Sequence, residues 1–153
     1  MVYWAGWLLT GAALIASTVA IIMRMVILTR PPVSNLYETF VFVGFISVIT
    51  GVIIERINRQ WLGLIIASIS GFTFLTIASK FSMEGDTLQM LVAVLNSNFW
   101  LSTHVLSITI GYSGVCVAGL IGHIYLIQAV HPSRNKESLD KIYRILEIGR
   151  AHV

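Results

Sequence analysis

Charged residues are scarce in this sequence. Asp, Glu, Lys and Arg make up only 11% of its 153 residues, whereas hydrophobic residues make up 56% and the mean hydropathy is +0.84. A water-soluble domain carries about 25% charged residues. This shortage excludes an ordinary soluble domain and indicates that the chain lies in lipid. The net charge of +3 is small, so it gives no reason to expect a nucleic-acid partner.

Cysteine is nearly absent as well. The single cysteine, Cys116, lies within an apolar stretch, so no internal disulfide can form, and we interpret this residue as a small packing side chain. Without a CxxCH segment the chain cannot itself carry covalently attached c-type haem. A basic residue is also missing before the first apolar stretch. We therefore predict that this stretch is a membrane helix and not a signal peptide.

Long apolar stretches are what the sequence does contain. About 20 residues suffice to cross a bilayer as a helix. Four stretches come close to this length or exceed it, at residues 4–23, 36–54, 61–79 and 99–130. A proline pair, Pro31-Pro32, separates the first two, because proline lacks an N–H and restricts the residue before it. We predict an all-α fold, a polytopic bundle of four transmembrane helices in one membrane domain, residues 1–130.

The positions of basic residues predict how this bundle is oriented. Lysine and arginine are enriched in cytoplasmic loops. The turn at 55–60 and the C-terminal tail are rich in them, so we expect this turn and both termini on the cytoplasmic side. The segments 24–35 and 80–98 then lie on the outer side, where Arg24 and Arg30 depart from the rule.

Residues 131–147 form a charged segment, which we predict to be a cytoplasmic connection. Its apolar side chains recur at helical spacing, at Leu139, Ile142, Tyr143 and Leu146. We expect a short amphipathic helix that lies along the membrane or leads to a further span. Residues 148–153 are predicted to be a non-native tail, because the string from Glu147 to Val153 matches a common sequencing adapter translated in frame.

Two histidines lie within the fourth stretch, where ionisable residues are rare and typical of functional sites. His104 and His123 are separated by roughly 28 Å along a helix at about 1.5 Å per residue, so they lie near opposite membrane faces and cannot share one metal ion. Trp100 lies one turn before His104 on the same face. Small residues continue from there, at Ser107, Gly111, Gly114, Ala118 and Gly122. Since such residues let another helix approach closely, we expect His104 to point into the bundle.

The pattern around this histidine allows two interpretations. A neutral imidazole can coordinate haem iron while a neighbouring aromatic ring covers the porphyrin. Alternatively, His104 hydrogen-bonds a neighbouring helix or water. A second polar group opens the second stretch, where the spacing of Asn35, Tyr37 and Glu38 is typical of a helix cap with an interfacial tyrosine.

Two segments are similar to those of the CcsA-type cytochrome c assembly family, also called ResC-type, which handles haem in the system II pathway. Residues 30–39, RPPVSNLYET, resemble its PPxSNLYES segment, and residues 96–105, NSNFWLSTHV, resemble its LxSxxWLxxHV segment. The tyrosine that follows in the family is matched by Tyr112. Both segments come in the family's order, and each lies at the outer end of a predicted span.

The resemblance implies a membrane protein that binds b-type haem non-covalently, in transit, and delivers it to apocytochrome c with a CcsB/ResB-type membrane partner. The haem would lie on the outer face of a bacterial plasma membrane or the lumenal face of a thylakoid membrane. His104 would be an axial ligand of the haem iron, and Trp100 would contact the haem. An outer-face motif would support this site: Asn35, Tyr37 and Glu38. Because the family's tryptophan-rich WWD segment and second outer histidine are missing, we expect the N-terminal part of a longer protein, inactive in haem attachment by itself.

Three other functions stay open on the residues alone. A transporter or channel subunit would need buried charges within its spans or broken helices, which the second and third stretches lack. A b-type cytochrome would need paired histidines on two facing helices, whereas both intramembrane histidines here share one. A purely structural assembly subunit without haem chemistry would need none of these features.

Overall fold

The computed structural model describes residues 2–84, 87, 98–130, 140, 142–145 and 147. Four long helices make up most of this part: α1 (Val2–Leu28), α2 (Leu36–Asn58), α3 (Leu62–Glu84) and α4 (Asn98–Val130). All four are long and apolar enough to cross a membrane. The predicted all-α bundle with four spans is therefore confirmed. The end that contains residues 29–35 is named the outer end, following the predicted orientation, and the opposite end is named the inner end.

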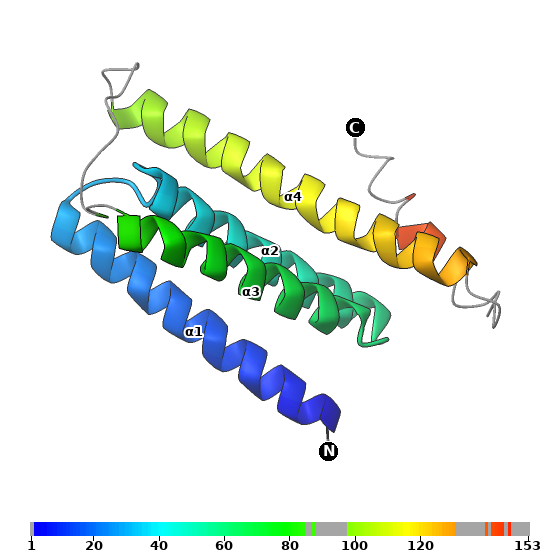
Figure 1. Cartoon of the computed structure of the whole chain (residues 1–153). Helices are drawn as coiled ribbons and strands as arrows, with labels where there is room; N and C mark the ends of the chain where they lie inside the picture. Colours follow the sequence, from blue (N-terminus) through cyan, green and yellow to red (C-terminus); the bar gives the residue numbers. More distant parts are fainter. Residues whose placement is uncertain are drawn as a thin grey trace.

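The helices lie side by side, with α2 and α3 in the centre and α1 and α4 flanking them (Figure 1). Glycines let the backbones of α2 and α3 meet. A Cβ added to Gly51 would lie 2.8 Å from the carbonyl oxygen of Gly63, and one added to Gly44 would lie 2.9 Å from the Cβ of Phe74. Small residues have this role between membrane helices because lipid provides no hydrophobic force that drives helices together.

α4 packs on the two central helices, mainly on α2, along one stripe of buried residues: Thr109, Ser113, Val117 and Ile121. The hydroxyl of Ser113 donates to the carbonyl oxygen of Val43 at 3.2 Å and links the two helices within the membrane. Such a hydrogen bond between membrane helices contributes about 0.6 kcal/mol on average. The side of α4 that carries this stripe is therefore its bundle side.

The C-terminal helical segment folds back onto the inner end of the bundle. Ile142 is buried in a cluster with apolar side chains of α3 and α4, which are Leu62, Ile66, Val117 and Ile121. The ring of Tyr143 lies 6.4 Å from that of Tyr125 in α4. The predicted amphipathic helix thus places Ile142 against the bundle itself. Residues 131–139 and the predicted non-native tail at 148–153 lie outside the described residues.

At the inner end, hydrogen bonds to a buried carboxylate connect α1, α2 and the start of α3. Glu55 of α2 is shielded from solvent, and its Oε1 accepts hydrogen bonds from the Tyr3 hydroxyl and the Trp61 backbone N–H, both at 3.0 Å. Its Oε2 accepts from the backbone N–H of Gly63 at 3.1 Å. Glu55 therefore satisfies N–H groups at the start of α3 and links α1 to α2 through Tyr3. Its place in a polar turn of the sequence does not reveal this role.

Candidate functional site

The outer end of α2 begins at a cap built on Asn35. The Oδ1 of Asn35 accepts a hydrogen bond from the backbone N–H of Glu38 at 2.8 Å, and Asn35 is extended, as an N-cap residue should be. The Glu38 side chain turns back, and its Oε2 accepts from the backbone N–H of Ser34 at 2.8 Å. The predicted cap is confirmed, and it brings the Glu38 carboxylate into the interior of the outer end.

Two arginines meet this buried carboxylate. The Oε1 of Glu38 lies 3.2 Å from Nη2 of Arg24 and 3.4 Å from Nη2 of Arg30, and the Glu38 side chain is only 4% exposed. Burying a charge is costly unless it is paired and hydrogen-bonded. This pairing accounts for two arginines at the end that the predicted orientation places outside, although basic residues are usually enriched on the cytoplasmic side.

The same network reaches the connection between α3 and α4. Nη2 of Arg24 donates to the carbonyl oxygen of Thr87 at 2.7 Å, and Nδ2 of Asn35 donates to the same oxygen at 2.8 Å. The Arg24 guanidinium also lies over the ring of Tyr37, 4.9 Å from its centre. The structure thus brings Asn35, Tyr37 and Glu38 together around Arg24 and Thr87. No motif in the sequence joins the last two residues to this cluster.

His104 and Trp100 lie on the first turns of α4 and are exposed on a shared face. The expectation that His104 points into the bundle is wrong for the helices described. The bundle side of α4 is the stripe that contains Thr109, and the small residues that continue from His104 lie on the opposite side. Gly111 and Gly114 are exposed, and a Cβ added to either would meet nothing within 4 Å.

The physical reason for this difference is that α4 carries two stripes suited to close packing. Thr109 and Ser113 have short side chains that allow a neighbouring helix to approach. Their hydroxyls also donate to carbonyl oxygens of α4 itself, Thr109 to Val105 at 2.6 Å and Ser113 to Thr109 at 2.9 Å. Because these two buried hydroxyls are hydrogen-bonded, neither leaves its own oxygen unsatisfied in the packed stripe. Spacing in the sequence cannot tell which of two such stripes meets the neighbouring helix.

A groove of about 450 Å³ lies between the outer turns of α4 and the turn after α1. Ser102 and Leu106 line it from α4, and Arg30 lines it from the turn. His104 is two residues from both Ser102 and Leu106, and residues two apart on a helix do not share a face. The Glu38 network and His104 are therefore two separate clusters at the same end of the bundle.

His104 offers a single possible iron ligand. Among the residues that the structure describes, no group of three or more histidine, cysteine, aspartate or glutamate side chains could hold a metal ion. The imidazole of His104 is open on the side of α4 that faces away from α2 and α3. His123 lies near the inner end of the same helix, where its Nδ1 is 2.7 Å from the carbonyl oxygen of Gly119. This hydrogen bond joins His123 to its own helix.

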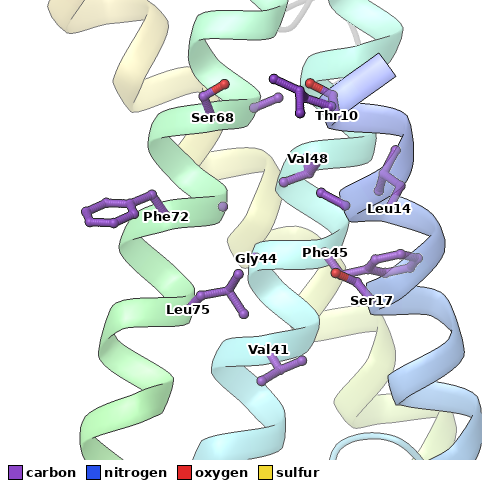
Figure 2. Close-up of a pocket in the computed structure, with 14 residues that line it drawn as sticks. Thr10, Leu14, Ser17, Val41, Gly44, Phe45, Val48, Ser68, Phe72 and Leu75 are labelled. Carbon is purple, nitrogen blue, oxygen red and sulfur yellow. The ribbon is translucent and has the colours of Figure 1, made fainter. Parts of the chain in front are cut away.

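A separate pocket of about 240 Å³ lies between α1, α2 and α3, within their spans (Figure 2). Leu14 and Ser17 of α1 line it together with Phe45 of α2 and Leu75 of α3. None of the 14 residues that line it is ionisable. The pocket suits an apolar chain and has no group that could coordinate iron. Sequence reasoning did not predict it, because a gap between helices depends on how far α1 stands from its neighbours.

Comparison with known proteins places this architecture in a class. The family model described as "Cytochrome C assembly protein" matches residues 33–150, which is more than half of the chain. The fold and the match together define a polytopic membrane protein of a family described by cytochrome c assembly. The chain belongs to the cytochrome c assembly protein family, and the resemblance based on the two motifs is confirmed.

Among curated proteins, the chain is similar to the cytochrome c biogenesis protein CcsA of Guillardia theta, with 29% identity over 141 residues. The matched region covers 90% of this chain and 46% of CcsA, so the chain spans less than half the length of that relative. No solved structure matches the chain. Both Glu38 and His104 fall within the region that the family model matches.

Proposed function

We propose that this chain binds haem at its outer face and takes part in haem delivery to apocytochrome c, as one part of a longer protein. The observation that carries the proposal is the imidazole of His104, exposed at the outer end of a membrane helix within a region that matches the cytochrome c assembly family. Ionisable side chains in membrane helices almost always face protein or a cavity. An exposed histidine here therefore indicates a ligand or a protein surface that meets this face of α4.

The surroundings of His104 suit a flat, largely apolar ligand. Trp100 lies one turn away on the same face with 62% of its surface exposed, and an indole ring exposed in this way can stack on a porphyrin. Further along this face, Gly111 and Gly114 have no side chains that would obstruct the ligand. In this proposal haem is the cargo, b-type and not covalently bound. His104 is an axial ligand of its iron, and Trp100 covers part of the ring.

The proposal extends to a longer protein and its partners. One imidazole supplies one axial ligand, so the second ligand and the surface that binds apocytochrome c would come from other parts of the protein or from a CcsB/ResB-type membrane partner. The matched region covers 46% of CcsA, which supports a division of these functions between this chain and other parts of the protein. The membrane would be a bacterial plasma membrane or a thylakoid membrane, with the haem site facing away from the side that holds the termini. Two exposed arginines at the inner end, Arg56 in the last turn of α2 and Arg59 just after it, support this orientation.

Other functions receive less support from the described residues. The charged residues of α2 and α3 lie near helix ends, whereas a transporter is expected to carry ionisable groups within its spans. Both described intramembrane histidines lie on α4, so this part of the chain lacks the facing pair that a b-type cytochrome needs. A structural assembly subunit without haem chemistry is the alternative that an experiment has to exclude.

The test replaces His104 with alanine in the intact protein. Haem that copurifies with the protein, its absorption spectrum and the yield of mature cytochrome c are measured. We expect His104→Ala to lower both haem content and maturation by at least about tenfold, as loss of a metal ligand or its support does. His123→Ala is the matched control, because it removes the other exposed histidine of α4 and should leave the haem unchanged. Unaltered haem content in folded His104→Ala would favour the structural subunit.

A further inference from the structure

The apolar pocket between α1, α2 and α3 opens onto the surface that the bundle presents to lipid. Leu9 and Phe72, which both line the pocket, are each 73% exposed. The lining residues of α1 run from Leu9 to Ser17, about 12 Å along a helix at about 1.5 Å per residue. The pocket is therefore elongated along the helices, within their spans (Figure 2).

The shape and lining of the pocket suit one hydrocarbon chain. Its volume is about 240 Å³. A helix, about 10–12 Å across with its side chains, would fill several times this volume over the same length. The hydroxyl of the lining residue Ser68 donates to the carbonyl oxygen of Leu64 at 2.8 Å, so this donor needs no ligand. A single unbranched chain from the surrounding lipid therefore fits the pocket better than a further helix does.

A basic residue lies beyond the inner end of the pocket. Arg56 follows the lining residue Phe45 by about three turns, so both lie on the same side of α2. The Arg56 guanidinium lies over the ring of Trp7 in α1, 5.9 Å from its centre. Trp7 comes three residues before the lining residue Thr10 and shares its side of α1. Arg56 and Trp7 thus belong to the same sides of α1 and α2 that line the pocket.

The charge of Arg56 suits an anion at the membrane surface. The neighbouring Glu55 accepts its hydrogen bonds from neutral donors of α1 and the start of α3. Among the described residues, both ion pairs between arginine and a carboxylate involve Glu38, at the opposite end of α2. Arg56 is exposed, and guanidinium groups match the geometry of phosphate.

The distance between Arg56 and the pocket matches one leaflet of a bilayer. Val48 is the lining residue of α2 nearest to Arg56, and the two are about 12 Å apart along the helix. Half of the hydrocarbon core is about 15 Å thick. A lipid whose phosphate contacts Arg56 can therefore extend an acyl chain into the pocket.

We propose that α1 and α2 bind one anionic phospholipid from the leaflet at the inner end. Its phosphate contacts Arg56, beside the ring of Trp7 at the level of the headgroups, and one of its acyl chains occupies the pocket. The bound lipid fills the space that α1 leaves beside its middle and so supports the packing of α1 on the central helices. This site lies away from His104, and the inference does not depend on haem binding.

The first test concerns the headgroup. The intact protein is placed in phosphatidylcholine vesicles that contain phosphatidylglycerol with a nitroxide near the end of one acyl chain, and electron paramagnetic resonance measures the immobilised fraction. We expect phosphatidylglycerol to be preferred over phosphatidylcholine that carries the same label. Arg56→Ala should lower this preference about fivefold, the loss expected for one basic residue at a lipid surface. Arg59→Ala is the matched control, because Arg59 is also exposed and its loss changes the net charge equally. Equal losses in the two variants would overturn the site.

The second test concerns the acyl chain. Ala13 lines the pocket, so Ala13→Leu should fill part of it and remove most of the immobilised signal. Ala12→Leu is the matched control, because Ala12 is an exposed alanine of the same helix that does not line the pocket. An immobilised signal that persists in folded Ala13→Leu contradicts the proposal.

A measurement on the unaltered protein decides the matter if Ala13→Leu fails to fold. Phosphatidylglycerol with a photoactivatable diazirine near the end of one acyl chain is irradiated with the intact protein, and mass spectrometry identifies the crosslinked peptides. Crosslinks between Leu9 and Ser17 support the site. Their absence, as when another helix of a longer protein covers the pocket, overturns it. Haem content should stay unchanged in Arg56→Ala and Ala13→Leu, so this inference and the proposed function can fail separately.

Discussion

At the scale of single residues, two glutamates of α2 hold the bundle together at its two ends. Glu38 and Glu55 are about 26 Å apart along the helix at about 1.5 Å per residue, close to the hydrocarbon thickness of about 30 Å. Both are buried, and each accepts a hydrogen bond from α1, Glu38 from Arg24 and Glu55 from Tyr3. Because α1 has no buried residue, these bonds attach it mainly through its ends.

Replacement of Glu55 tests this attachment. Glu55→Ala removes the acceptor for three donors, including the buried N–H of Gly63. Each buried donor left unsatisfied costs about 1–3 kcal/mol, so we expect the free energy of unfolding to fall by at least about 2 kcal/mol. The measurement is a denaturant titration in detergent micelles followed by circular dichroism. The adjacent, exposed Arg56 lies over Trp7, and Arg56→Ala should cost about 1 kcal/mol or less. Equal losses in the two variants would contradict the role of Glu55.

At the scale of helices, hydropathy predicts where a span lies in lipid but not where the helix ends. α1 continues through Arg24 to Leu28, and α3 continues through Lys80 to Glu84. Helical hydrogen bonds tolerate a charged side chain when that charge finds a partner or water. Arg24 finds Glu38, and Lys80 is exposed. The four spans were therefore predictable from composition, whereas the helix ends depend on contacts between segments distant in sequence.

The candidate site likewise combines features that the sequence predicts with features that it does not predict. The cap at Asn35 and the shared face of Trp100 and His104 follow from local spacing, so the sequence predicts them. The outward direction of His104 depends on which stripe of α4 packs on α2. The pairing of Arg24 with Glu38 depends on how α1 meets α2. Residue spacing predicts neither the direction of His104 nor the pairing of Arg24, because both depend on how whole helices pack.

The glycines of α3 and α4 should respond differently to substitution. A Cβ on Gly63 would meet backbone atoms of Gly51 and Glu55, so Gly63→Ala should force α2 and α3 apart and lower stability by about 1–3 kcal/mol. A Cβ on Gly119 of α4 meets nothing within 4 Å. Because alanine favours a helix over glycine by up to about 1 kcal/mol, Gly119→Ala should leave thermal stability unchanged or raise it. A loss for Gly119→Ala as large as for Gly63→Ala would show that the close contact of α2 and α3 is not the cause.

At the scale of the whole molecule, the two flanking helices, α1 and α4, differ in how they are attached to the central pair. α1 is attached at both ends and leaves an apolar pocket beside its middle (Figure 2). α4 flanks the two central helices (Figure 1), and its exposed His104 lies on the side of α4 that does not pack on them. Both polar clusters, the Glu38 network and the face of His104, lie at the outer end. The proposed haem delivery therefore requires that this end face the compartment in which cytochrome c matures.

The orientation of the bundle can be measured because the chain has one cysteine. In a Cys116→Ser background, Thr29→Cys places a thiol at an exposed position just after α1, and Gln60→Cys places one in the α2–α3 turn. A maleimide that cannot cross the membrane should label Thr29→Cys in intact cells and Gln60→Cys only after permeabilisation. The arginines beside Gln60 favour the cytoplasmic side, whereas those at the outer end are paired with Glu38. The opposite labelling pattern would place His104 on the cytoplasmic side, where a haem bound to it could not reach apocytochrome c across the membrane.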